Sequence, residues 1–250
     1  MIVEYNRPQS IEEALDLLGH PEKRVYPLGG GTVLSCHSEP GSSVVDLQGL
    51  GLDKVSKDGS EIQLGATCTL QKLLNDPLVP SGLKPLIKKE TNINLRQTAT
   101  LAGALISADG RSTLGMAMLA LDATMIWLPG KVKVSYGDWL SIRGRRKDGL
   151  LISGITIPGN VKLLFEFVSR TPEDLPIVCA ALAQWPSGRT RVALGGYGSA
   201  PIMAFDGPDS LGTKSAVMNA YIHAEDNKAS GEYRSKIAGI LVQRLLNLDS

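Results

Sequence analysis

The stretch Leu28-Gly29-Gly30-Gly31-Thr32 is the one from which the rest of the sequence is best interpreted. Consecutive glycines let the backbone adopt positive φ and leave their N–H groups unshielded by side chains. Such N–H groups can form a concave nest for a phosphate or diphosphate, to which the Thr32 hydroxyl could add a donor. A sharp structural turn needs the same glycines, so the motif leaves both interpretations open.

A small α/β lobe is expected around this loop, ending near residue 52. Ser10 and Glu13 have the spacing of a capping box, and the apolar residues between 11 and 18 recur at helical spacing. The strands expected in this lobe are 24–28 and 44–47.

The remaining elements predict a second α/β lobe and a C-terminal block that starts near residue 159. The expected strands are 61–67, 124–128, 150–157, 161–168 and 189–197. The expected helices are 69–74, 84–89, 114–121, 174–185 and 232–248. Within this scheme Asp174 opens a helix as its N-cap or first-turn acid. A polar, mobile stretch is expected over residues 205–214.

The composition is that of an ordinary folded protein with nearly balanced charge. The 250 residues include 26 Lys and Arg against 25 Asp and Glu, so the broad basic footprint of a nucleic-acid-binding protein is absent. A local basic cluster at 143–147 predicts a solvated turn. Charged residues interrupt the long apolar stretch 98–128, which argues against a membrane span. We therefore expect neither nucleic acid nor a membrane as a partner.

Cysteine usage and motif searches exclude several kinds of site. Cys36, Cys68 and Cys179 are far apart and sparse, which fits a reducing cytoplasm and cannot supply a zinc ribbon or an iron–sulfur cluster. The P-loop, dinucleotide, metalloprotease and nucleophile-elbow patterns are all missing. No catalytic residue and no metal ligand is therefore predicted, and any redox chemistry requires a bound cofactor.

Several short motifs follow one another in order along the chain. They are YNRPQSIEEA at 5–14, GGGT at 29–32, VVDL at 44–47, LGA at 64–66, LR through G at 95–103, LALDA at 119–123, DLPIV at 174–178, LGG at 194–196 and ASGEYR at 229–234. Together they resemble the flavin-binding medium subunit of molybdenum hydroxylases of the xanthine dehydrogenase and carbon monoxide dehydrogenase type. The resemblance covers nearly the whole chain.

The resemblance implies an α+β fold: an FAD-binding domain of the vanillyl-alcohol-oxidase/PCMH type, followed by a small domain with an antiparallel sheet and helices. The FAD-binding domain would cover 1–158, with lobes of about 1–52 and 53–158, and the flavoprotein-subunit domain would cover 159–250. In such cytoplasmic complexes a large molybdopterin-binding subunit oxidises the substrate. A small iron–sulfur subunit passes electrons to FAD, which delivers them to an acceptor.

The resemblance also implies where FAD would bind. The diphosphate would lie on main-chain N–H groups of two loops, one from Leu28 to Val33 and one comprising Thr100, Leu101, Ala102 and Gly103. Thr113 matches a family aspartate at the start of the buried helix. Asp174 would lie near the ribityl chain or the flavin ring.

Several positions depart from the family pattern, and most of the changes reduce the hydrogen-bonding capacity of the expected FAD site. Apolar or weaker groups replace polar ones or glycine at Val33, Ala102, Ala104, Thr113 and Phe167, and Leu175 stands where the family often has an aromatic residue. Because a hydrogen bond to a charged group is worth about 1.5–3 kcal/mol, losing three could weaken binding roughly a thousandfold. Three hypotheses follow: an FAD-dependent oxidoreductase subunit, a degenerate member that has lost FAD and acts as a scaffold, or a site for another phosphorylated ligand.

Overall fold

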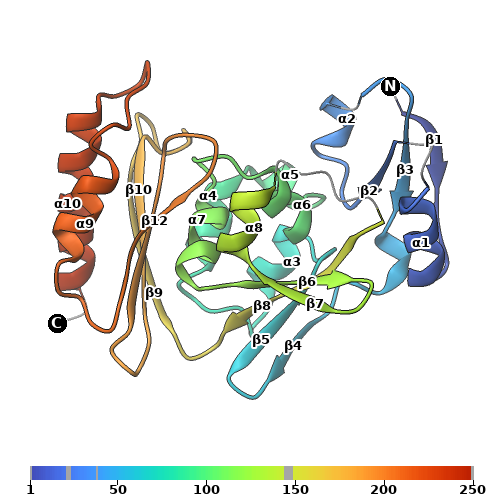
Figure 1. The fold of residues 1–250 in the computed structure, drawn as a ribbon, viewed down its shortest axis with the longest axis horizontal. Coiled ribbons are helices and arrows are strands. Elements are labelled where there is room, and N and C mark those ends of the chain that lie inside the picture. Colours follow the sequence, from blue (N-terminus) through green and yellow to red (C-terminus); the bar gives the residue numbers. More distant parts are fainter. Residues whose placement is uncertain (1, 21–23, 38, 144–148, 249–250) are drawn as a thin grey trace. The chain divides into compact units, whose positions relative to one another are not determined.

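The computed structural model describes residues 2–20, 24–37, 39–143 and 149–248. Most of the basic cluster at 143–147 lies outside this part of the chain. The chain divides into two compact units, and each contains segments that are far apart in sequence (Figure 1). The first unit consists of Met1–Leu78, Asn92–Ser107 and Thr124–Ile157. The second consists of Val79–Thr91, Ala108–Ala123 and Pro158–Ser250.

The expected boundary at 158 coincides with the start of the last segment of the second unit. Two earlier segments, however, belong to that same unit, so the compact units do not follow a single cut in the sequence. The division into domains 1–158 and 159–250 stays a prediction.

The first part of the first unit is a three-stranded parallel sheet in the order β1-β3-β2. Its elements are β1 (Ile2–Asn6), α1 (Ile11–Leu18), β2 (Val25–Leu28), α2 (Leu34–His37), β3 (Ser42–Asp46) and the 3-10 helix η1 (Gln48–Leu50). Ser10 is the N-cap of α1, because its hydroxyl accepts a hydrogen bond of 3.1 Å from the backbone N–H of Glu13, while the Glu13 carboxylate accepts from the N–H of Gln9 at 2.7 Å. The glycine loop follows β2 directly, so the sheet fixes where the loop begins.

The rest of the first unit is a five-stranded sheet in the order β4-β5-β8-β6-β7 with short helices. Its strands are β4 (Val55–Asp58), β5 (Glu61–Gly65), β6 (Thr124–Leu128), β7 (Val132–Ser135) and β8 (Leu151–Pro158). Its helices are α3 (Leu70–Asn75), α5 (Ile93–Arg96), α6 (Leu101–Ser107) and α8 (Tyr136–Ile142). Leu128 and Leu151 join the apolar core formed by α1 and the first sheet, so the two sheets share buried side chains.

The second unit is built on a four-stranded antiparallel sheet in the order β12-β11-β10-β9. Its strands are β9 (Lys162–Val168), β10 (Val178–Gln184), β11 (Thr190–Gly195) and β12 (Ile202–Gly207). Its helices are α4 (Lys84–Glu90), α7 (Thr113–Ala120), α9 (Thr213–Ala220) and α10 (Gly231–Asn247). Helices α9 and α10 cover one face of the sheet and α7 covers the other (Figure 1).

The helix predicted over 174–185 is wrong, because residues 178–184 form strand β10. The six residues Val178–Ala183 are all fully buried, since α7 and α10 cover the two faces of this central strand. A strand covered on both faces has a continuous apolar run, and such a run can also match helical spacing. Asp174 consequently lies in a turn before a strand and caps no helix.

The stretch 205–214 also differs from the expectation of a polar, mobile segment. Its first three residues end β12 and its last two begin α9, so only residues 208–212 lie outside regular structure. The sequence pattern does not predict β12 or α9, because few of their residues are fully buried and their apolar periodicity is weak.

Candidate functional site

Two loops of the first unit, predicted from their glycines, pack directly against each other. A Cβ atom on Gly30 would lie 1.6 Å from the carbonyl oxygen of Thr98, and one on Gly29 would lie 2.4 Å from the Thr100 hydroxyl. Gly30 therefore leaves room for the backbone of the second loop, and Gly29 leaves room for the Thr100 side chain. Gly31 is a glycine for a different reason, because its φ of 72° lies in the left-handed region.

The glycine loop presents main-chain N–H groups that the fold does not use. Within the part of the chain that the structure describes, the N–H groups of residues 29–33 have no hydrogen-bond acceptor. The carbonyl groups, in contrast, are engaged: Gly29 accepts from the Gln48 amide at 3.2 Å and Gly31 from the Ser35 N–H at 3.1 Å. Hydrogen bonds to its carbonyl groups therefore hold the loop in place, and its N–H groups are available to bind an anion.

The second loop is different, because the protein itself satisfies most of its donors. The N–H groups of Leu101 and Ala102 donate to the carbonyls of Cys68 and Ala66, at 2.9 and 3.0 Å. The Gly103 N–H lies 3.3 Å from the Thr100 hydroxyl. Thr100 keeps an N–H without an acceptor among the described residues. Fewer donors are thus available here than the resemblance implied.

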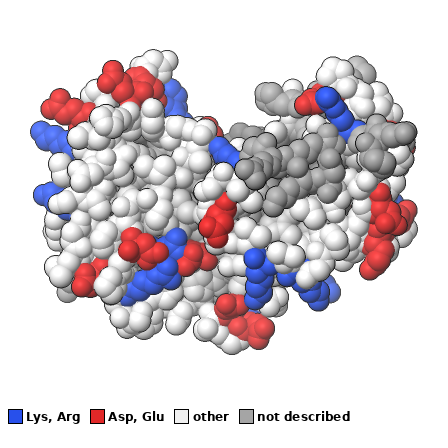
Figure 2. Space-filling model, in the orientation of Figure 1, with Lys and Arg blue, Asp and Glu red and all other residues white. Residues whose placement is uncertain are grey.

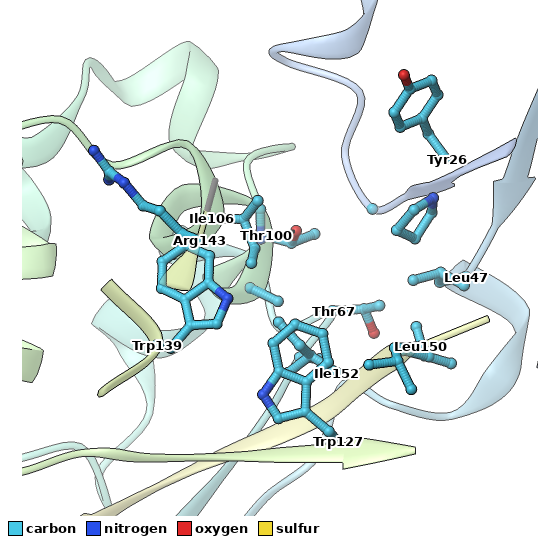
Figure 3. A pocket seen from close by; sticks show the side chains of 16 residues that line it. Tyr26, Leu47, Thr67, Thr100, Ile106, Trp127, Trp139, Arg143, Leu150 and Ile152 are labelled. Carbon is cyan, nitrogen blue, oxygen red and sulfur yellow. Dashed lines mark hydrogen bonds between the residues drawn. The ribbon is translucent and has the colours of Figure 1, made fainter. Parts of the chain in front are cut away.

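A cavity of about 370 Å³ lies beside the two loops, within the size range of small-molecule sites. We call it the loop cavity. Its wall includes Tyr26 and Leu47 on one side and the indole rings of Trp127 and Trp139 on the other (Figure 3). Gly29, Thr100, Ala102 and Gly103 also line it, and further apolar contacts come from Ile106, Leu150, Leu151 and Ile152. An adjoining groove of about 180 Å³ runs over the glycine loop as far as Val33 and Leu34.

Thr67 is the polar side chain of the loop cavity that the sequence reading missed. Its residue is 7% exposed, and its hydroxyl oxygen has no hydrogen-bond partner, although its backbone N–H donates to the Leu52 carbonyl at 2.9 Å. A buried hydroxyl without a partner costs free energy unless a ligand or water satisfies it. The only sequence signal was its position directly after the LGA motif at the end of β5.

Thr113 lies in the second unit and is fully buried. Its hydroxyl donates to the Leu86 carbonyl at 2.9 Å and lies 3.0 Å from a carboxylate oxygen of Glu90. These contacts give it a structural role at the start of α7, while a contact with a cofactor stays a prediction.

Asp174 also lies in the second unit, in an exposed turn. It lines a separate cavity of about 330 Å³, together with Leu175 and Ile177. The other lining residues of this cavity are Arg111, Arg170 and Lys228. Phe167, where the family often has a lysine, has the Lys89 ammonium 4.4 Å from its ring centroid.

Two other kinds of site find no support in the described part of the chain. No group of three or more His, Cys, Asp or Glu residues could hold a metal ion there. None of the helices described there has the length and apolar character needed to cross a membrane. On the face shown in Figure 2, basic and acidic side chains lie in small mixed groups, in line with their nearly equal numbers.

Comparisons with known proteins place these features in context. Residues 1–160 match the sequence profile of a family described as the FAD binding domain in molybdopterin dehydrogenase. The chain is 28% identical to the uncharacterized protein YgfM of Escherichia coli K12, over 98% of this chain and 95% of YgfM. It is 24% identical to the carbon monoxide dehydrogenase medium chain of Afipia carboxidovorans, over 96% and 94% of the two chains.

The fold has a close counterpart among solved structures. A chain of reconstituted CO dehydrogenase from Oligotropha carboxidovorans superposes with a TM-score of 0.80 at 22% identity, covering 98% of this chain and 96% of that one. The expected α+β fold of a flavoprotein subunit is confirmed by this likeness.

Proposed function

The chain belongs to the family of FAD-binding domains of molybdopterin dehydrogenases, and from that premise we propose that it binds FAD as the medium subunit of a molybdenum hydroxylase-type complex. In that role it relays electrons from iron–sulfur clusters to an acceptor. The proposed partners are a large molybdopterin-binding subunit and a small iron–sulfur subunit, and the proposed location is the cytoplasm. The similarity to medium subunits along nearly the whole chain supports this role.

The observation that carries the proposal is the row of unused N–H groups in residues 29–33 beside the loop cavity. A diphosphate offers several anionic oxygens to such a row, and its negative charge strengthens each hydrogen bond. The Thr67 hydroxyl supplies a buried polar partner, and the two indole rings supply apolar area for a flat ring system. The residues present therefore fit the adenosine diphosphate part of FAD.

Among the described residues that line the loop cavity there is no carboxylate, histidine or thiol to serve as an acid–base catalyst. Its titratable side chains are Tyr26 and Arg143. FAD supplies the redox chemistry when it is bound, which is the usual division of labour in cofactor enzymes. The residues of this chain bind the diphosphate through the glycine loop, orient the adenosine through Thr67 and the indole rings, and exclude water with the apolar wall.

The experiment is a titration of the full chain with FAD, followed by tryptophan fluorescence. Two of the three tryptophans, Trp127 and Trp139, line the loop cavity, whereas Trp185 lies in the second unit. We expect saturable quenching that largely persists in Trp185→Phe and is much reduced in Trp127→Phe/Trp139→Phe. We also expect Thr67→Val to raise the dissociation constant about fivefold, the worth of one ordinary hydrogen bond. Absence of saturable quenching, with no flavin absorbance in purified protein, would contradict FAD binding.

One observation favours the scaffold hypothesis as a second candidate. The N–H groups of Leu101 and Ala102 are already satisfied within the protein, so the second loop contributes little to a diphosphate. A scaffold subunit predicts no thermal shift with FAD together with stable co-purification with the partner subunits. Stabilisation by ADP or NAD, but not by FAD, would instead support a site for another phosphorylated ligand.

A further inference from the structure

Gln48 lies outside both glycine-bearing loops, yet its side chain contacts the first of them. Its amide nitrogen donates to the Gly29 carbonyl at 3.2 Å. A carbonyl oxygen accepts only from the nitrogen of a glutamine amide, so this contact also fixes which way the amide faces. Gln48 is the first residue of η1 and is not among the residues that line the loop cavity or the adjoining groove. Any effect of its side chain on a ligand would therefore pass through the loop.

The backbone at Gln48 is held in place by the first sheet. Its N–H donates to a carboxylate oxygen of Asp46 at 3.0 Å, and Asp46, which ends β3, is 3% exposed. The other carboxylate oxygen of Asp46 accepts from the Tyr5 hydroxyl and lies 3.7 Å from the Arg7 guanidinium. Contacts from β1 and β3 thus fix the point from which the Gln48 side chain reaches Gly29.

The hydrogen bond to the Gly29 carbonyl also orients the N–H group of the next residue. In a trans peptide the C=O and N–H groups lie in one plane and point in opposite directions. Gln48 therefore keeps the Gly30 N–H directed away from itself, and this N–H has no acceptor among the described residues. Gly30 lines the groove over the glycine loop. Because glycine has the widest conformational freedom, a peptide group between two glycines depends on such a contact for its orientation.

Two other peptide groups of the loop are anchored by backbone donors instead. The carbonyl of Leu28 accepts from the Leu47 N–H at 3.0 Å. The carbonyl of Gly31 accepts from the Ser35 N–H at 3.1 Å. These main-chain contacts do not need the Gln48 amide, so a substitution at Gln48 releases one peptide group of the loop and leaves the other two anchored.

We propose that Gln48 is a positioning residue for diphosphate binding, because its side-chain amide holds the Gly29–Gly30 peptide group so that the Gly30 N–H is presented to the phosphate oxygens. This inference rests on the proposed function, in which the glycine loop binds the diphosphate of FAD. A donor that is oriented before the ligand arrives loses less freedom on binding, so the contact made by Gln48 should appear in the affinity for the ligand.

The test compares Gln48→Met, which keeps the approximate length of the side chain and removes its amide, with Gln63→Met, the same change at an exposed position on β5. Isothermal titration calorimetry of the full chain with FAD and with ADP, which both carry a diphosphate, measures the dissociation constants. We expect Gln48→Met to raise both constants about fivefold, the worth of one hydrogen bond, and Gln63→Met to leave both within about twofold.

Two measurements without ligand separate positioning from a general loss of structure. The amide nitrogen NMR resonance of Gly30 should shift in Gln48→Met, because this nitrogen belongs to the peptide group whose carbonyl loses its hydrogen bond. The midpoint of thermal unfolding should stay within about 2 °C of that of the unmodified protein, since Gln48 is exposed.

The outcomes distinguish the positioning role from the proposed function. If the unmodified chain binds FAD and the two variants bind it equally well, the positioning role is overturned and FAD binding stands. An unmoved Gly30 resonance in Gln48→Met also overturns the positioning role. Binding of ADP that weakens in Gln48→Met, with no binding of FAD, supports the positioning role and contradicts the proposed function. Binding of neither ligand to the unmodified chain overturns both.

Discussion

The Glu90 carboxylate accepts a hydrogen bond of 2.8 Å from the backbone N–H of Leu114, in the first turn of α7. The hydroxyl of Ser112, the N-cap of that helix, donates to the same carboxylate at 2.8 Å. Glu90 ends α4, so a single buried carboxylate joins two helices of the second unit. Burial is the largest influence on this group and raises the pKa of the Glu90 carboxyl, against the opposing effect of its hydrogen bonds.

This contact predicts a pH-dependent contribution of Glu90 to stability. Because the folded pKa lies above the unfolded one, folding favours the protonated form, and that contribution is complete below the unfolded pKa. It is lost as the pH rises through the folded pKa. We therefore expect the unfolding free energy of the unmodified protein to fall, relative to that of the non-titrating Glu90→Gln variant, from acidic to neutral pH. Urea denaturation at several pH values measures it.

The matched control is Glu173→Gln, at an exposed position of the same unit. Its unfolding free energy should differ from that of the unmodified protein by less than about 0.5 kcal/mol at each pH. A pH-independent difference for Glu90→Gln would show that its protonation is not linked to folding.

The buried Arg234 guanidinium joins α10 to two backbone carbonyls and one carboxylate of the second unit. The substitution Arg234→Met removes the donors to the carbonyls of Ile177 and Gly196 and to the Asp226 carboxylate. We expect a loss of about 3 kcal/mol of unfolding free energy. Arg244→Met on the same helix is the control, because that side chain is 64% exposed and its ion pair with Glu166, at 3.6 Å, should be worth less than about 1 kcal/mol. Equal effects of the two variants in chemical denaturation would contradict this role.

A side chain at position 30 should create a packing defect that does not involve any ligand. In Gly30→Ala the new methyl group would collide with the Thr98 carbonyl, so the two loops must separate. We expect a loss of about 2 kcal/mol or more of unfolding free energy. Gly49→Ala is the control in the same unit, because its nearest neighbour would be the Pro8 carbonyl at 3.9 Å. If both alanines are tolerated equally in thermal denaturation, the contact between the loops is not required for folding.

The sequence predicted elements well where local chemistry decides the structure. The helix over 11–18 follows from its N-cap and its helical apolar spacing. The helix predicted over 114–121, from residues that are apolar on nearly every side, is α7 (Thr113–Ala120), and all eight of its residues are buried. The apolar spacing over 174–185 wrongly indicated a helix where the structure has strand β10, because burial by helices on both faces is a tertiary property that no local pattern shows. The glycine loop could be identified as a nest, but that Gly29 and Gly30 serve loop packing depends on Thr98 and Thr100, about seventy residues away. Apart from its position after the LGA motif, Thr67 had no sequence signal, because only the folded cavity reveals its unpaired hydroxyl.

Ala102 offers a direct test of why the second loop departs from the family pattern. The residue lines the loop cavity, where a methyl group occupies space that the family's glycine leaves open. Ala102→Gly should therefore lower the dissociation constant for FAD about tenfold, since one carbon in a ligand pocket is worth roughly 1–3 kcal/mol. Ala104→Gly is the matched control, because it weakens the same helix by a similar amount, about 1 kcal/mol, without lining the cavity. Tighter binding in Ala102→Gly alone would identify this methyl group as the obstacle. Unchanged affinity for FAD in both variants would contradict that role. The contribution of the second loop would then be limited by its N–H groups, since those of Leu101 and Ala102 already donate to the carbonyls of Cys68 and Ala66.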